Sequence, residues 1–577
     1  MKRTSKPVKV TLAHINDTHS YFEPSALQLT VDLDGNAITP YVSAGGFARI
    51  AARRNQLKQH ASEQGRHFLF LHAGDCFQGT LYFSLFKGKA NADMLSALNL
   101  DAMTIGNHEL DMGNEPVVNF AKRIGFPLLA GNWDISQELT TKTCRLNDCE
   151  NIKPYQPQTN TATYIVKEFD EEPVAIFGLS LDKMMDIAQP DTDTPFVNAI
   201  QVARNTVEQL NKQGINKIIL LSHLGYEGDM DLAEQVKGIS LIVGGHSHKL
   251  QGDFSSLGLG KDDEYGLKVN DTRIVQAGFH SLTMGHCEID FSESGEVTHF
   301  TGKNELLLGR QLFLNASMDQ VATDDTYRRV RQLIDNHPNV SVCKKDHDTQ
   351  AILVEKYMPK VRELQRDIIG YAPRKLRHVR LPDEKGASEI APLVAESFLF
   401  TLGQDGIELD FAIHNAGGVR NSLNEGKIST ADIAGKLLPF AVPIGYYSVS
   451  GHTIAAILEG AIDNAINNGV EGTGSGSYPY TYNLKFDYLA SQPQGKRIAN
   501  LLVYKDEQWQ SVKPDTIYRG TSSAYTMKGK EGYNAILNTV GTVGTTQYSM
   551  ADCMVTFLKD DPNKLAKVCR HFTQVTS

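Results

Sequence analysis

Short apolar runs alternate with amphipathic stretches along the first half of the chain. The runs lie at residues 8–15, 68–72, 102–105, 127–130, 174–179, 218–221 and 241–243. Between them, residues 47–59 and 199–213 repeat apolar positions at helical spacing. This alternation is typical of layered α/β folds, in which buried strands are covered by helices. We therefore predict such a fold for residues 8–300.

The pattern changes between about Ser317 and Ile369. This segment is charged and lacks strand-like runs, and it twice places apolar residues at helical spacing, at Val330, Leu333 and Ile334 and at Val361, Leu364 and Ile368. Pro359 is expected to kink or end the second helix. We predict a domain at residues 1–315, a helical linker at 316–369 and a second domain at 370–577.

The second domain is also expected to be α/β. It shows helical patterns at residues 388–402 and 452–467, and strand-like runs at 409–413, 482–488 and 498–504. Residues 471–477 are rich in Gly and Ser, which favours a mobile loop.

Composition narrows the functional class. The chain has 577 residues, 41% apolar and 21% charged, and a formal net charge of -10. These values fit a globular protein and argue against a nucleic-acid polymer as partner, because such binders are usually basic. No apolar run is long enough for a membrane span. The basic start has no apolar segment behind it, so we expect a cytoplasmic protein; a removed signal would instead indicate a periplasmic or extracellular one.

The cysteines predict no disulfide framework, because the chain has only seven of them, an odd number. Cys144 and Cys149 are close enough in sequence to pair in an oxidising compartment. Cys76 follows an acidic residue, but we interpret it as a small packing residue and not as a nucleophile.

Five polar motifs directly follow apolar runs of the first half. They are Asn16-Asp17-Thr18-His19, Gly74-Asp75, Gly106-Asn107-His108-Glu109-Leu110-Asp111, Ser222-His223 and Gly244-Gly245-His246-Ser247-His248. In layered α/β folds, ligands bind beyond the carboxyl ends of the strands. Asp-x-His and His-x-His spacing would put both side chains on one side of an extended segment. We therefore expect these motifs to form one site.

The residue types point to metal ions. Two carboxylates, four imidazoles and one amide are seven candidate ligands, too many for one ion and suitable for two ions that share a carboxylate. Mixed oxygen and nitrogen donors without cysteine favour a catalytic site over a structural zinc site. Two divalent ions with two carboxylates leave a charge of about +2, which suits a phosphate anion.

These motifs resemble those of calcineurin-like metallophosphoesterases, and the Gly106–Asp111 form resembles that of the 5′-nucleotidase family. The resemblance implies a four-layer α/β/β/α sandwich joined by the linker to a smaller α/β nucleotide-binding domain. It further implies two divalent ions, such as Mn, Zn, Co or Mg. One would be held by Asp17, His19, Asp75 and His248, and the other by Asp75, Asn107, His223 and His246. Relatives often have Gln at the position of His248.

The same resemblance makes His108 a catalytic residue that does not bind metal. His108 would contact the phosphate, and Asp111, three residues further on, would orient it. A metal-bound hydroxide is then expected to attack the phosphorus.

The second domain resembles the nucleoside-binding domain of that family less closely. Asn415, Gly417, Gly418 and Arg420 match an Asn-Gly-Gly-x-Arg-like motif, and Arg380 and Phe440 match a substrate arginine and a stacking aromatic. Tyr525 stands in place of a second aromatic, and Glu531 in place of an Asp that holds the ribose. A second arginine expected after Arg380 is replaced by Glu384. The nucleotide clamp is thus partly kept and partly altered.

The sequence therefore predicts an enzyme that hydrolyses nucleotide phosphoesters. Two alternatives use the same scaffold: a 2′,3′-cyclic nucleotide phosphodiesterase with 3′-nucleotidase activity, and a sulfur-ester hydrolase. A binding protein without activity is the alternative of a different class, and the complete ligand set together with His108 and Asp111 argues against it. The sequence leaves open the oligomeric state, the preferred base and the identity of the metals.

Overall fold

The computed structural model describes residues 5–469, 474–566 and 574–576. The chain divides into two compact units. The first unit contains Met1–Gln78 and Leu85–Met358, and the second contains Gly79–Ser84 and Pro359–Ser577.

The predicted strands of the first unit form two sheets. In the first sheet, β8 (Leu128–Ala130), β7 (Ala102–Thr104), β6 (His67–His72) and β1 (Val8–Ile15) are parallel neighbours. β1 also pairs antiparallel with β17 (Thr283–Phe291), and β17 with β18 (Val297–Phe313). In the second sheet, β12 (Glu172–Ser180), β13 (Lys217–His223), β14 (Leu241–Val243) and β16 (Thr272–Val275) are parallel.

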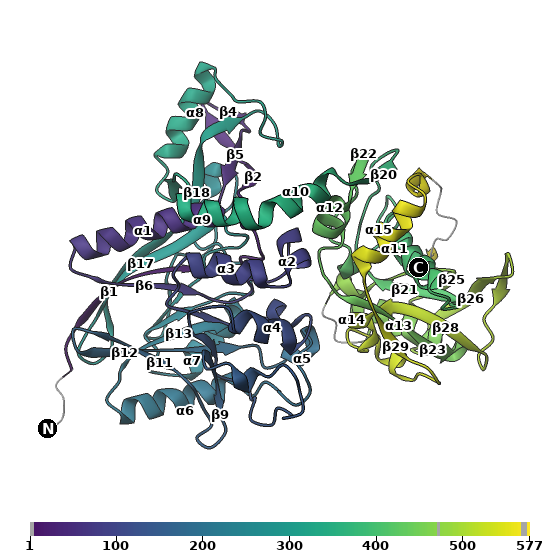
Figure 1. Cartoon of the computed structure of the whole chain (residues 1–577), viewed down its shortest axis with the longest axis horizontal. Coiled ribbons are helices and arrows are strands. Elements are labelled where there is room, and N and C mark those ends of the chain that lie inside the picture. Colours follow the sequence, from purple (N-terminus) through teal and green to yellow (C-terminus); the bar gives the residue numbers. More distant parts are fainter. Residues whose placement is uncertain (1–4, 470–473, 567–573, 577) are drawn as a thin grey trace. The chain divides into compact units, whose positions relative to one another are not determined.

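The two sheets pack face to face because alternate side chains of each strand point to opposite faces. Val10, Leu12, Leu69 and Leu71 of the first sheet share a buried core with residues of the second, among them Val174, Ile176, Ile219 and Leu221. Helix α1 (Phe47–Glu63) packs against β1 and β6, whereas α6 (Ala199–Lys212) and α7 (Tyr226–Gln235) cover the second sheet (Figure 1). The four-layer α/β/β/α fold is confirmed.

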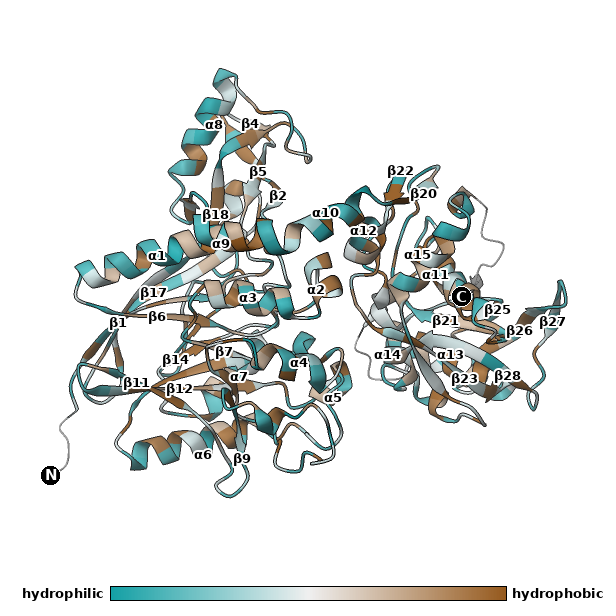
Figure 2. Ribbon diagram, viewed as in Figure 1, coloured by the Kyte–Doolittle hydropathy of each residue, from teal (hydrophilic) through white to brown (hydrophobic). Residues whose placement is uncertain are grey.

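Hydropathy follows these layers. Figure 2 shows hydrophobic residues along β12, between the layers, while the outward side of α6 carries hydrophilic residues.

The remaining elements of this part of the chain are β2 (Ser25–Gln28), β3 (Val31–Leu33), β4 (Asn36–Ile38), β5 (Tyr41–Ala44), α2 (Leu81–Phe86), α3 (Lys89–Ala97), α4 (Asn114–Ala121), β9 (Ile152–Gln156), β10 (Thr161–Ala162), β11 (Ile165–Phe169), α5 (Met184–Ile187) and β15 (Leu267–Val269).

The segment expected to be a linker is only partly separate from the first unit. Helix α8 (Asp325–Asp335) begins at Asp324, whose side chain accepts a hydrogen bond from the amide of Tyr327, and β19 (Val340–Val342) then pairs with β18. A strand of three residues is too short to show an alternating pattern in sequence. Helix α9 (His347–Ile352) packs on α1 and continues through a π-helical turn, Leu353–Tyr357, into α10 (Met358–Arg366).

The π-helical turn lies directly before Pro359, where the sequence predicts a kink or an end. Proline has no amide proton to donate to the carbonyl four residues earlier, and a π-helical turn accommodates that missing bond without ending the helix.

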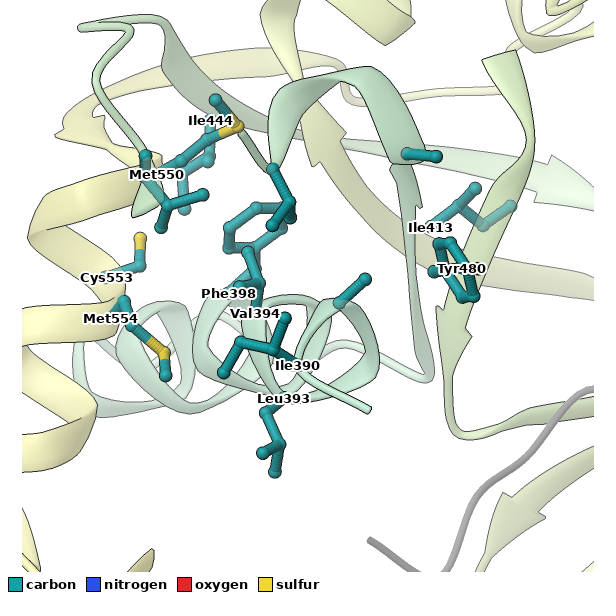
Figure 3. Packing of buried hydrophobic residues seen from close by; sticks show 14 of the residues in the cluster. Ile390, Leu393, Val394, Phe398, Ile413, Ile444, Tyr480, Met550, Cys553 and Met554 are labelled. Carbon is teal, nitrogen blue, oxygen red and sulfur yellow. The ribbon is translucent and has the colours of Figure 1, made fainter. Parts of the chain in front are cut away.

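The second unit is built around a sheet in which five strands are neighbours in the order β24 (Pro479–Tyr482), β21 (Phe411–Asn415), β28 (Ile517–Ser523), β23 (Pro443–Ser450) and β29 (Gly544–Ser549). Its core packs α11 between this sheet and α15: Val394 and Phe398 lie between Met550 and Met554 on one side and Ile413 and Tyr480 on the other (Figure 3). The elements are β20 (Ile368–Ala372), α11 (Ala391–Gln404), β21 (Phe411–Asn415), β22 (Gly426–Ser429), α12 (Thr430–Asp432), β23 (Pro443–Ser450), α13 (Gly451–Ile466), β24 (Pro479–Tyr482), β25 (Leu484–Leu489), β26 (Ile498–Lys505), β27 (Gln508–Ser511), β28 (Ile517–Ser523), α14 (Ala524–Met527), β29 (Gly544–Ser549), α15 (Met550–Asp560) and β30 (Gln574–Thr576).

Three further sequence expectations concern loops, helices and cysteines. Of the Gly/Ser-rich loop at residues 471–477, residues 471–473 lie outside the described residues, and Ser475–Ser477 form a 3-10 turn. Within the part of the chain that the structure describes, no helix has the length and apolar character to cross a bilayer. Cys144 and Cys149 are free thiols, while Cys569 is among the residues not described.

Candidate metal centre

The polar motifs converge because they follow strands whose carboxyl ends lie at the same edge of the sandwich. Asp17 follows β1, Asp75 follows β6 and Asn107 follows β7, while His223 ends β13 and His246 follows β14. Parallel neighbours end together, so their following loops meet.

Two groups of side chains offer ligand atoms to a metal ion. One group is Asp17, His19 and His248, and the other is Asp75, His223 and His246; within each group one ligand atom per residue lies within 4.8 Å of the others. Asn107 joins the second group, because its Oδ1 is 3.0 Å from Nδ1 of His246. All seven sequence-predicted ligands are therefore brought together in the first unit.

Backbone geometry at this site differs from the sequence expectation. Asp17, His19, Asp75, His246 and His248 have φ angles of 48°, 45°, 59°, 69° and 57°. The inference that Asp-x-His and His-x-His act as extended segments is therefore wrong. Left-handed conformations cost energy in residues other than glycine and gather at functional sites, where surrounding bonds enforce them. Here the amides of Asp17 and His19 donate to the carbonyls of Gly74 and Asp75, at 2.9 and 3.1 Å.

Hydrogen bonds to carbonyls fix the protons of two histidines. Nδ1 of His223 lies 2.7 Å from the carbonyl of Ala73, and Nδ1 of His19 lies 3.1 Å from that of Phe77. A carbonyl only accepts, so Nδ1 carries a proton in both rings and Nε2 is the nitrogen left to bind a cation. Nε2 of His223 faces Oδ2 of Asp75 at 3.1 Å, and Nε2 of His19 faces Nε2 of His248 at 3.2 Å. Each of these close pairs of atoms is suited to share a proton or a metal ion.

The charges of the site lead to the same conclusion. Burial opposes ionisation of Asp75, but His223 and His108 outweigh it and hold the pKa of Asp75 well below its usual value. Burial lowers the pKa of His19 to about 4, which keeps that ring neutral. Burial also works against the charged form of His223, yet the Asp75 carboxylate raises its pKa to about 10. The space between Asp75 and His223 thus attracts positive charge, and a metal ion would take the place of the proton.

His108 and Asp111 form a hydrogen-bonded pair beside the two groups. Nδ1 of His108 is 2.7 Å from Oδ2 of Asp111, and the imidazole ring lies 5.1 Å from that of His19. Burial disfavours the charged ring, but the carboxylates of Asp111 and Asp75 outweigh it and raise the pKa of His108 to about 9. The His108 amide also donates to Oδ1 of Asp75, at 2.9 Å. The pair is therefore fixed to the same carboxylate that serves the metal-binding groups.

Glu109 is a site residue that the sequence reasoning did not single out. Its side chain is buried and accepts four backbone hydrogen bonds, from Asp75, Cys76, Phe77 and Gly106, at 2.7 to 3.0 Å. It therefore ties the loop after β6 to the loop after β7. The available signal was an acidic residue inside the Gly-Asn-His motif, a position where a buried carboxylate can satisfy amide groups of a tight turn.

Two more side chains support the ligands. Asn16 donates from Nδ2 to Oδ2 of Asp17 and to the carbonyl of Gly278, both at 2.7 Å. The ring of His280 stacks on Tyr21 at 3.9 Å and lies 5.7 Å from the ring of His19. His280 comes from the loop before β17, far from the motifs in sequence, so no local pattern indicates it.

The candidate nucleoside-binding residues of the second unit gather at one edge of its sheet. Asn415 ends β21, and the 3-10 turn Ala416–Gly418 follows, so Gly417 and Gly418 lie in that turn. Arg420 is exposed, and its guanidinium lies 5.3 Å from the ring centre of Phe440, which precedes β23.

The other three candidates come from neighbouring segments. Tyr525 lies on α14, whose Thr526 hydroxyl donates to Oδ1 of Asn415 at 3.2 Å. Glu531 has a φ of 53° and is half-buried. Burial raises the pKa of Tyr533 well above its usual value, and the charges of Glu531 and Tyr525 add to this rise. Arg380 is exposed. Burial, together with the charges of Arg380 and Arg420, lowers the pKa of His378 to about 4, so both arginines act on the same histidine.

Comparisons with known proteins cover both units. The model of the calcineurin-like phosphoesterase family matches residues 10–250, and that of the 5′-nucleotidase C-terminal domain matches residues 368–538. The chain is similar to the NAD 5′-nucleotidase of Haemophilus influenzae, with 29% identity over 97% of this chain and 91% of the relative. A probable 5′-nucleotidase of Treponema pallidum is 28% identical over 96% of this chain and 92% of the relative.

Solved structures agree. A 5′-nucleotidase precursor from Thermus thermophilus has a TM-score of 0.68 and 26% identity, covering 96% of both chains. The NAD nucleotidase of Haemophilus influenzae has a TM-score of 0.61 and 27% identity, covering 96% of this chain and 97% of that one. The likeness therefore extends through both units, and this chain belongs to the 5′-nucleotidase family of metal-dependent phosphoester hydrolases.

Proposed function

We propose that this enzyme releases phosphate from nucleoside 5′-monophosphates. The observation that carries the proposal is the pair of metal-binding groups in the first unit with the His108–Asp111 pair beside them. A phosphoryl group carries negative charge on several oxygens, so its hydrolysis needs fixed positive charge and a fixed hydrogen-bond donor in one place.

Two divalent ions fit the donors that are present. Asp17, His19, His248 and Asp75 would hold one ion, and Asp75, Asn107, His223 and His246 the other, with Asp75 shared. When bound, such ions supply an activated water and positive charge for the phosphoryl oxygens. The protein contributes the orientation of the ligands, through the carbonyl bonds of His19 and His223 and through the bond from Asn16 to Asp17.

His108 would act on the substrate directly. Its Nδ1 is directed to Asp111, so Nε2 is the nitrogen that can donate to a phosphoryl oxygen. Asp111 keeps the ring in this orientation and stabilises its charged form. His108→Asn should therefore lower kcat for a phosphomonoester by roughly 10²- to 10⁴-fold, the usual contribution of a positioned acid or base. Wild-type turnover in this variant, with unchanged metal content, would disprove the role.

The second unit would recognise the nucleoside. Arg380, Asn415, Gly417, Gly418, Arg420, Phe440, Tyr525 and Glu531 are the proposed contacts. The Arg420–Phe440 pair offers a cation and an aromatic face close together, and a planar base can stack on such a surface. The names of the relatives also indicate nucleotides, including NAD for the Haemophilus influenzae protein.

A substrate panel tests the proposal. The metal-free protein would be reloaded with Mn, Zn, Co or Mg and supplied with nucleoside 5′-monophosphates, 3′-monophosphates, 2′,3′-cyclic nucleotides and p-nitrophenyl phosphate. The proposal predicts the highest kcat/KM for a 5′-monophosphate. A preference for cyclic or 3′-nucleotides would support the alternative phosphodiesterase activity. Activity on p-nitrophenyl phosphate alone would remove nucleotides from the account.

A further inference from the structure

His280 lies beside the candidate metal centre, and among the described residues it belongs to neither group of ligand atoms. Its ring centre is 5.7 Å from that of His19 and 6.2 Å from that of His248. Both of these histidines are proposed ligands of the first ion. His280 itself is only half-buried, so it stays partly open to solvent next to buried ligands. It is therefore an imidazole at the site that neither the ligand set nor the His108–Asp111 pair explains.

The backbone of His280 is held in an uncommon conformation. Its φ is 56° and that of Ser281 is 59°, so two consecutive residues other than glycine are left-handed. The His280 amide donates to the carbonyl of Asp17 at 2.8 Å, and the Gly46 amide donates to the carbonyl of Ser281 at 3.1 Å. Left-handed residues persist where such bonds enforce them, and they gather at functional sites. The fold thus fixes His280 directly to the loop that carries a metal ligand.

Aromatic contacts hold the imidazole ring as well. Tyr21 stacks on His280 with 3.9 Å between ring centres and 16° between ring planes. Phe279 meets the same ring edge-on at 4.6 Å, and Phe279 itself stacks on His248 at 4.9 Å. A side chain that is already held in place loses little conformational freedom when a ligand binds to it. The ring is therefore preorganised for a contact.

The chemistry of the ring suits a phosphoryl oxygen. An imidazole carries at least one N–H group in either charge state, so it can donate a hydrogen bond. A terminal phosphoryl group has three oxygens that carry no ester, and hydrogen bonds to charged oxygens are about twice as strong as neutral ones. The ring of His108 is 5.1 Å from that of His19 and that of His280 is 5.7 Å from it, so two imidazoles outside the ligand set adjoin the same ligand.

We propose that His280 is a substrate-binding residue that donates a hydrogen bond to a phosphoryl oxygen, and that Tyr21 is the residue that positions its ring. The inference rests on the proposed function, because it requires a phosphate ester at the metal centre. His280 contributes to binding of the phosphoryl group, whereas His108 acts in the reaction. The contact does not involve the nucleoside, so it serves every phosphomonoester alike.

The test uses the metal-loaded, full-length protein, with p-nitrophenyl phosphate as substrate and inorganic phosphate as ligand. His280→Phe keeps an aromatic ring for the stack on Tyr21 but removes the donor, whereas His280→Gln keeps an N–H group. His60→Phe makes the first change at an exposed position of α1 and is the control.

We expect His280→Phe to raise both the KM for p-nitrophenyl phosphate and the Kd for phosphate, measured by calorimetry, about tenfold, which corresponds to about 1.4 kcal/mol. Its kcat should stay close to that of the wild type, because the contact is made equally before and during the reaction. His280→Gln should recover most of the affinity, and His60→Phe should match the wild type. The ratio of kcat/KM for AMP to that for p-nitrophenyl phosphate should be the same in all of them.

A further variant, Tyr21→Leu, removes the stack and keeps the imidazole. It should raise the Kd for phosphate by a smaller factor than His280→Phe, because the donor is present but no longer held. The metal content of every variant, measured by mass spectrometry, should equal that of the wild type.

Unchanged KM and Kd in His280→Phe would overturn the inference. Loss of bound metal in that variant would also overturn it, because His280 would then support a metal ligand instead of the substrate. A wild type that hydrolyses p-nitrophenyl phosphate but no nucleotide would refute the proposed function alone, and the result for His280 would stand. A wild type that neither binds phosphate nor hydrolyses either substrate would refute both.

Discussion

At the scale of single residues, the carboxylate of Glu109 shows how the site is held in shape. It accepts hydrogen bonds from four backbone amides in the two loops that carry Asp75 and His108. A buried amide left without an acceptor costs about 1–3 kcal/mol. One carboxylate therefore stabilises both the shared metal ligand and the proposed catalytic histidine, although it contacts neither metal nor substrate in our account.

Glu109→Gln should weaken this arrangement while the fold is kept. The amide side chain has one acceptor oxygen instead of two, so we expect a loss of about 1–3 kcal/mol in the free energy of unfolding of the metal-free protein. For a positioning role we further expect kcat for AMP to fall more than KM rises, and the bound metal to decrease. Glu115→Gln, at an exposed position of α4, is the control. If kcat and metal content were unchanged in Glu109→Gln, the positioning role would be contradicted and the role of Glu109 would be purely structural.

At the scale of elements, the strands were predictable and the loops were not. Buried strands such as β1, β6 and β13 are rich in apolar residues, and their bounds follow the sequence pattern within one or two residues. The left-handed conformations of Asp17 and His19 were not predictable, because they depend on bonds to a loop distant in sequence. Short strands such as β19 were missed for lack of length, and His280 because only the fold brings it to the site. Glu109 lies within the motif, but its bonds to the loop after β6 are visible only in the fold.

Substitutions at two glycines, neither of which has a left-handed φ, test how closely the loops after β6 and β7 approach each other. A Cβ on Gly106, before Asn107, would lie 2.2 Å from Oδ1 of Asp75, whereas a Cβ on Gly125 would meet nothing within 4 Å. Gly106→Ala should therefore displace Asp75 and at least halve the metal retained after dialysis, as measured by mass spectrometry of the metal content. Gly125→Ala should retain the wild-type amount. Equal retention in both variants would contradict the close packing of the loops after β6 and β7.

At the scale of the whole molecule, chemistry and recognition are assigned to different units. The metal-binding groups lie in the first unit, and the Asn415–Arg420 segment with Phe440 lies in the second. Family-model matches to both units support this division. The sequence predicted the first part more completely than the second, because metal ligands must be particular residue types, whereas a base can be held by many combinations of aromatic and polar side chains.

This division predicts a selective effect of Arg420→Met. The change removes a charge beside Phe440 but keeps much of the side-chain volume. KM for AMP should rise about tenfold, a loss of about 1.4 kcal/mol of binding. The ratio of kcat/KM for AMP to that for p-nitrophenyl phosphate, which has no nucleoside, should fall correspondingly. Arg519→Met, on the exposed surface of β28, is the matched control. An equal loss on both substrates would place Arg420 outside nucleoside recognition.

The central claim is a two-metal centre that hydrolyses phosphoesters, and counting metal ions against activity tests it most directly. Protein stripped with a chelator and titrated with Mn or Zn should bind two ions per chain, and phosphate release from AMP should appear as the sites fill. Asp75→Asn should bind fewer ions and show little activity, because in the proposed centre both ions would share that carboxylate. Full activity in the stripped protein, or two bound ions and normal turnover in Asp75→Asn, would contradict the account.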